Sequence, residues 1–399
     1  MSVMRRNAAI FVTISLVAGF GGTAMNLVAG IWILDLTDSV SLAGLAGLCV
    51  YAPSLAAPWL GGLVDRLPRR RLVIVVDLVL SVLLSTLLLV RGREQVWLIF
   101  AVLIAKGFAY VLLDAGESAL LPAALPPEAL GDVNGWRSSA QEGMKLVAPL
   151  AGAGLYAWRG GGTVAVVSAL MPVVAAILYA ALKLNTVPAV AERPRLKEGL
   201  RLLVGDPRIR TPVLVAAIAI GMSGLGNASV YARVTVDLGL PSTFLGVLGT
   251  AQGAGSIAGG LIVGRIIAWR GARATAAVGA VVFGAGCLLQ CLPWWPAMVA
   301  GSVVIGIGLP WALVAGLTAV QTYTPDHLLG RVSATSTMLM FGPIALTNPL
   351  GAAVVHLGSR VALVTAAVVV CAAAAVTAVS TRPTYPSGRT QNKVGSSTP

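Results

Sequence analysis

Among the ionisable side chains inside long apolar runs of this sequence, six are the main candidates to carry or exchange a proton or to modulate one that does. Four of them fall between residues 96 and 120, at spacings of four, eight and eleven from the first: Lys106, Tyr110, Asp114 and Glu117. At about 100° per residue, these spacings place all four on one face of a helix. The other two, Glu142 and Lys145, are one helical turn apart in the run 137–158. Ionisable residues inside an apolar span are costly to bury, so they are candidate functional residues.

Two interpretations of these charges are open. In the first, a carboxylate among Asp114, Glu117 and Glu142 binds and releases a proton as its surroundings change, while Lys106 or Lys145 modulates its affinity for that proton. In the second, Glu142–Lys145 and Asp114–Lys106 are static pairs that only neutralise each other. Glu117 has the least obvious local partner. We therefore expect Glu117 to be the titrating group.

The elements that position these charges must be membrane-spanning helices. Apolar residues make up 57% of the 399 residues and charged residues only 11%, with a mean hydropathy of +0.87. A soluble domain has about 25% charged residues. A span needs about 20 apolar residues, and twelve runs qualify: 8–33, 40–62, 71–91, 96–120, 137–158, 162–183, 211–232, 243–267, 274–293, 295–318, 331–356 and 360–381. The runs are continuous rather than alternating, which predicts an all-α integral membrane protein.

Basic residues concentrate on one side of this predicted membrane protein. The net charge is +13, and 21 of the 28 Lys and Arg residues fall in termini and loops on the side of the N-terminus. Such an excess marks the cytoplasmic side, so we predict that both termini are cytoplasmic. The preference for Arg over Lys, with abundant Ala, Val and Gly, suggests a bacterial protein and hence the bacterial cytoplasmic membrane. No soluble domain carries the charge, so lipid rather than nucleic acid is the expected partner.

The sequence contains no constellation typical of an enzyme or a metal centre. The four cysteines all lie in apolar runs, and no histidine or carboxylate near them could complete a metal site: Cys49, Cys287, Cys291 and Cys371. Small apolar packing is the expected role of these cysteines. We predict no catalytic residues, no metal and no cofactor.

The chain is built from two similar halves. Gly61-Gly62-Leu63-Val64 recurs as Gly259-Gly260-Leu261-Ile262, and Ala148-Pro149-Leu150 recurs as Asn348-Pro349-Leu350. The offset is 198 to 200 residues, and a third match between these two has the same offset. Parallel six-helix repeats around a central cavity are a transporter architecture. We predict two pseudo-symmetric six-helix bundles with the following boundaries: 1–183 and 211–381, with a cytoplasmic connector at 184–210 and a disordered cytoplasmic tail at 382–399.

The connector contains a candidate amphipathic helix. Leu196, Leu200 and Leu203 share one face of it, and basic residues surround that face. This pattern is typical of a helix that lies on the cytoplasmic lipid surface. A solvated linker is the alternative.

One acid and four arginines cluster between the second and third apolar runs, in the segment 61–72. Arginine at a bilayer centre costs about 3 kcal/mol, so this segment must sit at a membrane face. It resembles the signature loop of the major facilitator superfamily, G-x-L-x-D-R-x-G-R-R, and the matching residues are Gly61, Leu63, Asp65, Arg66, Arg69 and Arg70. Pro68 replaces the usual glycine. The resemblance implies the twelve-helix fold of that family and extends over nearly the whole chain.

The signature loop is a candidate conformational gate. A helix N-terminus carries about half a positive charge, so Asp65 can latch onto a helix of the other half, expected near Arg331. Arg66, Arg69 and Arg70 can pair with acids or with anionic lipid. Bonds made in one conformation only would bias the inward–outward equilibrium. Plain topological anchoring is the alternative.

Finer features resemble the drug-efflux branch of the superfamily, which includes macrolide and siderophore exporters. These features are the stretch 32–39, the connector segments 197–201 and 206–208, and Pro325 followed by 330–332. In that branch a Gly-Pro pair with flanking glycines marks antiporters. Here Pro149 has Gly143 and Gly152 near it, but Ala148 takes the place of the usual glycine. Ordinary packing of a glycine-rich helix is the alternative.

The expected function is export of an amphipathic drug or natural product by a proton-coupled antiporter, which works as a monomer through alternating access. An importer or symporter of a small metabolite is the second possibility. Methionines, aromatics and amides suit a wide, tolerant substrate cavity, and the candidates to line it are Met25, Asn26, Tyr110, Met222, Asn227, Trp311 and Gln321.

Overall fold

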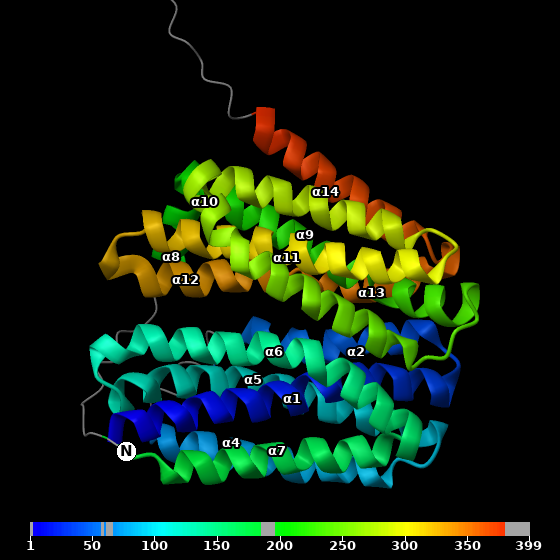
Figure 1. The fold of residues 1–399 in the computed structure, drawn as a ribbon, viewed down its shortest axis with the longest axis horizontal. Helices are drawn as coiled ribbons and strands as arrows, with labels where there is room; N and C mark the ends of the chain where they lie inside the picture. The colour runs from blue at the N-terminus through cyan, green and yellow to red at the C-terminus, as the bar shows by residue number, and fades with distance from the viewer. Residues whose placement is uncertain (1–2, 57–59, 61–66, 185–195, 380–399) are drawn as a thin grey trace, which may run out of the picture.

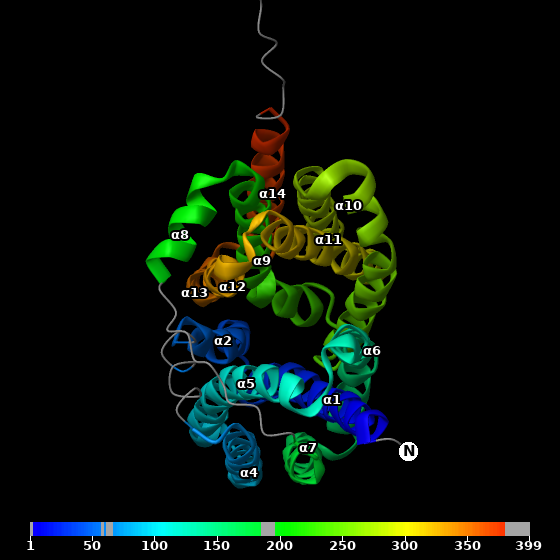
Figure 2. The same ribbon diagram turned by 90° about the vertical axis from the view of Figure 1, so that its left-hand side faces the viewer.

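The computed structural model describes residues 3–56, 60, 67–184 and 196–379, and every regular element in these residues is a helix. The helices form two layers, one above the other in Figure 1. The first layer contains α1 (Val3–Thr37), α2 (Val40–Tyr51), α4 (Arg69–Thr86), α5 (Val96–Ala124), α6 (Pro127–Arg159) and α7 (Gly161–Ala181). The second layer contains α9 (Pro207–Ala232), α10 (Phe244–Gln290), α11 (Trp295–Tyr323), α12 (Asp326–Phe341), α13 (Ile344–Val354) and α14 (Val361–Val379). The connector helix α8 (Leu196–Gly205) lies beside the second layer (Figure 2).

Short single-turn elements extend several of these helices. They are 3₁₀ turns at η1 (Ala52–Ala56), η2 (Leu87–Leu89), η3 (Arg93–Gln95) and η5 (Val355–Leu357), and a π-helical turn, η4 (Arg233–Asp237).

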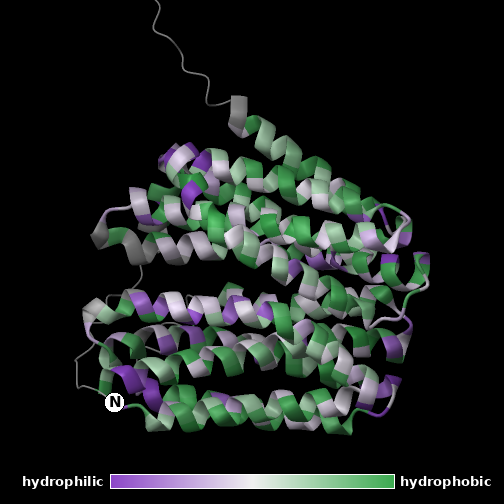
Figure 3. Cartoon of the chain, in the orientation of Figure 1, coloured by the Kyte–Doolittle hydropathy of each residue, from purple (hydrophilic) through white to green (hydrophobic). Residues whose placement is uncertain are grey.

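Eight helical segments within the described ranges are long and apolar enough to cross a membrane. Two shorter apolar segments are Val40–Ala56 and Val361–Thr377. Apolar residues dominate most of the helices in Figure 3, and hydrophilic residues gather mainly toward helix ends and along α6. The protein is thus an all-helical, multi-pass membrane protein. The count of twelve crossings stays a prediction.

Backbone breaks explain why the predicted runs and the helices differ in places. Gly271 has φ 78° and divides α10 into two helical segments, as expected from the separate runs 243–267 and 274–293. The run 331–356 is continuous in sequence, yet Gly342 and Pro343 separate α12 from α13. α6 starts ten residues before its apolar run, because Pro127 suits the first helical turn.

Apolar clusters fill each layer, and a further cluster joins the two layers. In that cluster, Ile31 and Leu34 of α1 pack with Leu245 and Leu248 of α10. We call the end of the molecule that contains Asn7 the amino end, and the opposite end the far end. Asn7 ties three helices at the amino end, because its amide donates to the carbonyls of Ala124 (2.9 Å) and Lys183 (2.8 Å).

Glycines let the two layers approach closely. A side chain at Gly253 of α10 would collide with the Lys145 carbonyl of α6, and one at Gly44 of α2 would meet Ala228 of α9 at 2.6 Å. Polar bonds support the same contact, since Ser41 donates to the Ala352 carbonyl at 2.8 Å. These contacts lie toward the far end, so the layers are joined there.

The connector helix α8 docks on the protein. Leu203 is fully buried with Ile209 and Val213 of α9, whereas Leu200 is about half exposed. Part of the predicted apolar face therefore covers the second layer. Contact of Leu200 with lipid stays a prediction.

Asp206 links α8 to α9 as an N-cap. Its carboxylate accepts a hydrogen bond from the backbone N–H of Arg208 at 2.8 Å and pairs with the Arg208 guanidinium at 2.9 Å. The side-chain bond and then the backbone bond from Arg208 hold the pKa of Asp206 below its usual value. Asp206 lies outside the candidate spans.

Candidate functional site

A cavity of about 340 Å³ lies between the layers. Helices of both layers line it, including Gly47 and Tyr51 of α2 from the first layer and Met222 and Asn227 of α9 from the second. Its polar lining consists of amides and hydroxyls: Tyr51, Ser223, Asn227, Tyr231, Gln252, Gln290, Ser302 and Asn348. None of the described residues that line it carries a charge. Ligand pockets commonly combine an apolar wall with a few polar groups and occupy about 300–1,000 Å³.

The layers close this cavity toward the far end. Asn227 donates to the Gly44 carbonyl across the interface at 3.1 Å. Ser41 hydrogen-bonds to His356 Nε2 at 2.9 Å. Tyr231 lies against Gly30, where no larger side chain would fit. Close contacts at Gly30 and Gly44 and the hydrogen bonds across the interface therefore close the far side of the cavity.

Some of the predicted cavity residues line the central cavity, and others lie elsewhere. Met222 and Asn227 line the central cavity. Met25 and Trp311 do not, and their prediction as lining residues is wrong: Met25 is fully buried in the first-layer core, and the Trp311 indole donates to the Gly259 carbonyl at 2.9 Å. Both lie in long apolar runs, and the sequence does not show which face of these helices points toward the cavity. Gln321 is exposed near the end of α11.

Lys106 is bound to α1 rather than to a carboxylate. Its ammonium donates to the Gly22 carbonyl at 2.8 Å and to Asn26 Oδ1 at 2.5 Å. Asp114, one of its expected partners, is exposed. The predicted Asp114–Lys106 pair is therefore wrong, because the lysine side chain reaches across to acceptors on the neighbouring helix. Asn26 thus positions Lys106 and does not line the central cavity.

Glu117 forms an ion pair with Arg137 of α6. Arg137 Nη2 lies 2.5 Å from Glu117 Oε2, and both side chains are mostly buried, with 14% and 12% exposed. Arg137 also donates to Ser15 of α1 at 3.3 Å. Glu117 had the least obvious local partner in the sequence, and its ion-pair partner is indeed not on its own helix. The spacing within one run cannot reveal a partner that comes from a different helix.

The predicted pair Glu142–Lys145 is present, with 2.5 Å between Glu142 Oε1 and Lys145 Nζ. Both side chains are substantially exposed, at 40% and 52%. Tyr110, from the same predicted stripe as Glu117, is 70% exposed. Three of the sequence candidates thus face open space in this structure: Tyr110, Asp114 and Glu142.

Part of the signature loop lies outside the described residues, namely Gly61, Asp65 and Arg66. Arg69 and Arg70 begin α4. The Arg70 guanidinium donates to the Ala180 carbonyl at the end of α7, within the same layer. Arg6 similarly donates to the Ala181 carbonyl at 3.0 Å. The gating role of the loop stays a prediction.

Pro149 and Gly152 of α6 lie at helix crossings. Pro149 faces Gly246 and Gly249 of α10, and Gly152 faces Ala24 of α1. Gly143 has open space around it. Pro149 and Gly152 therefore contribute to close packing, which leaves their predicted role in antiport as a hypothesis.

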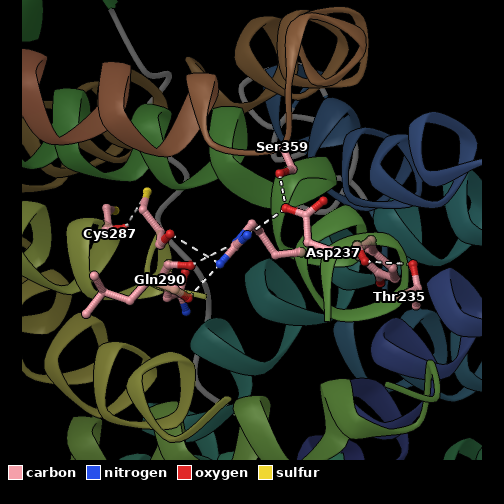
Figure 4. Close-up of polar contacts among 9 residues, drawn as sticks. Thr235, Asp237, Cys287, Gln290 and Ser359 are labelled. Carbon is pink, nitrogen blue, oxygen red and sulfur yellow. Dashed lines mark hydrogen bonds and ion pairs between the residues drawn. The ribbon is translucent and has the colours of Figure 1, made fainter. Parts of the chain in front are cut away.

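A second polar network lies at the far end of the second layer (Figure 4). Arg233 is fully buried. Its guanidinium pairs with Asp237 at 2.6 Å and donates to the carbonyls of Gln290 at 3.2 Å and Leu292 at 2.6 Å. Ser359 donates to Asp237. This network binds η4 to the end of α10.

The comparisons with known proteins agree with this architecture. The sequence profile of the Major Facilitator Superfamily matches residues 11–234 and 213–398. This chain belongs to the major facilitator superfamily. It is therefore a secondary transporter and not an enzyme.

Relatives of this major facilitator transporter include Macrolide efflux protein A of Streptococcus pyogenes, with 24% identity over 248 residues. That match covers 58% of this chain and 60% of the relative, less than two thirds of its length. Among solved structures, a mutant of the nucleoside transporter NupG has a TM-score of 0.73 at 13% identity and covers 94% of this chain and 98% of its own. A bacterial homologue of the iron transporter ferroportin has a TM-score of 0.68 at 15% identity, with coverage of 95% and 100%. Both show the same fold.

Several site residues of this transporter escaped prediction. Gln252, Gln290 and Ser302 line the central cavity, but single polar residues in apolar runs carry no distinctive spacing. Asn348 also lines the central cavity. The sequence repeat of Ala148-Pro149 as Asn348-Pro349 marked this position but assigned it no role. No group of three or more His, Cys, Asp or Glu side chains that could hold a metal ion occurs within the described ranges.

Proposed function

We propose that this transporter exports an amphipathic organic compound by alternating access. The observation that carries the proposal is the central cavity, which is lined by both layers and closed toward the far end. If the layers rock about that contact, the cavity opens first to one side of the membrane and then to the other. Its mixture of aliphatic, methionine and amide groups suits a compound with a large apolar surface and several hydrogen-bonding groups.

The relative named for macrolide efflux supports export of a bulky natural product. Its match covers only part of each chain, so the substrate class is part of the proposal. An uncharged cavity lining favours hydrogen-bonding and apolar contacts over recognition by a formal charge.

We further propose two six-helix bundles with twelve crossings, both termini in the cytoplasm of a bacterium, and action as a monomer. The amino end is then cytoplasmic, and the structure represents a state that is closed on the outer side. The positive-inside bias supports this orientation.

The proton gradient is the proposed energy source. The first layer holds several carboxylates in or near the spans, of which Asp114, Glu117 and Glu142 are the sequence candidates. Glu117 is tied to Arg137, so protonation of Glu117 would release that guanidinium. Such a release could shift α6 relative to α5 and so couple protonation to the movement of the layers.

A substrate-panel efflux assay in a sensitised bacterial host tests the proposal. We expect lower accumulation of at least one macrolide-like or other amphipathic compound in cells that express the protein, and loss of this effect when a protonophore is added. Efflux that persists with the protonophore would refute proton coupling. Accumulation above that of control cells would indicate import instead.

A further inference from the structure

A second cavity, of about 100 Å³, lies inside the first layer and is separate from the central cavity. It is enclosed by α1, α4, α5 and α7, and its polar lining groups are Asp77 of α4, Lys106 and Tyr110 of α5, and Ser168 of α7. A water molecule needs about 15 Å³ of such space, so the cavity can hold several.

Asp77 is the unusual residue of this cavity. Its side chain is only 3% exposed, and its Oδ2 has no hydrogen-bond partner among the residues that the structure describes. Ser168, 2% exposed, also lines the cavity with an unpartnered Oγ. A buried polar group without a partner is costly, and a buried carboxylate without a counter-ion is much more so. Two such groups around one cavity indicate that the cavity takes up something that bonds to them.

Within the described ranges, the charged neighbours of Asp77 form no ion pair with it. From α5, Glu117 interacts electrostatically with Asp77, and Lys106 lines the same cavity with its ammonium bonded to Gly22 and Asn26 of α1. From α7, Tyr179 interacts with both Asp77 and Glu117. From α1, the lining residues are Ala18, Gly21 and Gly22, which carry no charge. Arg137 of α6, the guanidinium beside Glu117, is already paired with that carboxylate.

We propose that Asp77 is the carboxylate that binds the coupling proton, and that the surrounding cavity supplies the water through which this proton arrives and leaves. The inference rests on the proposed proton coupling, and it assigns the proton to Asp77 in place of the sequence candidates Asp114, Glu117 and Glu142. A hydronium ion in the cavity gives its proton to Asp77 Oδ2, an O–H bond forms, and a neutral water remains. Release is the reverse transfer to a cavity water, so no other reactant is needed.

The geometry favours a proton over a metal cation. The ammonium of Lys106 shares the cavity and would repel a second fixed cation, and few oxygen ligands surround Asp77. A protonated Asp77 is neutral and needs only hydrogen bonds. Tyr110 lines the cavity and is 70% exposed, so its side chain extends from the cavity to the surface of the structure.

The protonated state of Asp77 also suggests how the proton acts on the transporter. A neutral Asp77 is compatible with its buried position, whereas an ionised Asp77 requires water or movement of a counter-charge toward it. The closest charged assembly is the Glu117–Arg137 pair on the neighbouring helices. Loss of the proton from Asp77 is therefore expected to strain that pair and favour a different arrangement of α4, α5 and α6.

Infrared difference spectroscopy on the purified protein in liposomes tests the inference without a known substrate. Between acid and alkaline buffer, we expect the wild type to lose a carbonyl band of a protonated carboxylic acid. Asp77→Asn should remove this band, and the matched control Glu117→Gln should keep it. A band that is unchanged in Asp77→Asn, or that never titrates, would overturn the inference.

A second set of variants guards against misfolding. If Asp77→Asn does not fold, Asp77→Glu should retain the band and shift the pH at which it disappears. Ser168→Ala should shift the same midpoint upward, since it removes a hydroxyl that can stabilise the ionised form. Unchanged midpoints in both variants contradict the inference, as does a midpoint that depends on sodium rather than on pH alone.

Transport measurements distinguish a failure of the proposed function from a failure of the role assigned to Asp77. With the compound found in the efflux panel, Asp77→Asn should lose efflux driven by a proton gradient but keep exchange of labelled for unlabelled compound. Wild-type efflux that does not depend on the proton gradient refutes the proposed function. Proton-driven efflux in both the wild type and Asp77→Asn refutes only the role of Asp77.

Discussion

Glu117 and Arg137 form a largely buried ion pair that joins α5 to α6, with 2.5 Å between Oε2 and Nη2. Arg137 also reaches Ser15, so one guanidinium connects three helices of the first layer. A buried pair is sensitive to loss of one partner, because the remaining charge keeps its desolvation cost. The pair therefore makes the amino end of the first layer dependent on both residues.

We expect Arg137→Gln to lower the free energy of unfolding by about 3 kcal/mol, because Glu117 then stays buried without its partner. Denaturant titration in mixed micelles measures this loss. The double variant Glu117→Gln/Arg137→Gln should lose less than Arg137→Gln. Lys145→Gln, which breaks the exposed pair with Glu142, should change stability by less than about 1 kcal/mol. Equal losses in Arg137→Gln and Lys145→Gln would contradict this ranking.

Gly253→Val should abolish transport while the protein still folds. Its side chain would collide with the Lys145 carbonyl where α10 crosses α6, so the layers could not close at that contact. Gly260→Val on the same helix is the matched control, since Gly260 has open space around it. Efflux assays, combined with size-exclusion profiles of the purified variants, measure the effect. Normal efflux in Gly253→Val would show that this close contact is not needed.

Arg233→Lys should destabilise the second layer by about 2 kcal/mol, because an ammonium cannot reproduce the bonds to Asp237 and to three backbone carbonyls. The measurement is thermal unfolding in detergent. Arg265→Lys, at an exposed position of α10, should leave the melting temperature unchanged. A similar melting temperature for both variants would argue against a structural role of the Arg233 network.

Asp206→Ala should lower stability by about 1 kcal/mol at neutral pH, through loss of the N-cap of α9. Because the pKa of Asp206 is lowered in the folded protein, its ionised form stabilises the fold above the pKa of the unfolded chain. That contribution disappears as the pH falls through the folded pKa. The difference between the wild type and Asp206→Ala should therefore shrink in acid. Asp206→Asn, which keeps a capping oxygen, should lose less at neutral pH, and an equal loss would assign the effect to the charge.

Gln252→Leu should weaken transport several-fold, since it removes a hydrogen-bonding group from the central cavity; an unmade hydrogen bond costs about 1 kcal/mol. The concentration for half-maximal efflux is the measured quantity. Gln321→Leu is the control, because Gln321 is exposed near the end of α11 and does not line the cavity. A larger effect of Gln321→Leu than of Gln252→Leu would place the substrate site outside the central cavity.

Local pattern predicted much of the helical architecture. Continuous apolar runs marked the positions of the helices, and the break at Gly271 fell between two predicted runs. The pair Glu142–Lys145 was predictable because i and i+3 positions meet on any helix. The break between α12 and α13 was missed, because Gly342-Pro343 lies within an otherwise apolar run. Met25 and Trp311 were misplaced because they lie in apolar runs without a polar side that fixes the helix rotation.

The sequence by itself determined that this protein is a helical membrane protein of the major facilitator superfamily, because composition, run length and the signature motif are local properties of the chain. The tertiary structure decided that Glu117 pairs with Arg137, that Arg233 is buried, and that Asp77 faces a cavity. These relationships depend on how each helix is rotated and where it crosses its neighbours. That geometry is set by packing among residues far apart in the chain, and no spacing within a single helix encodes it.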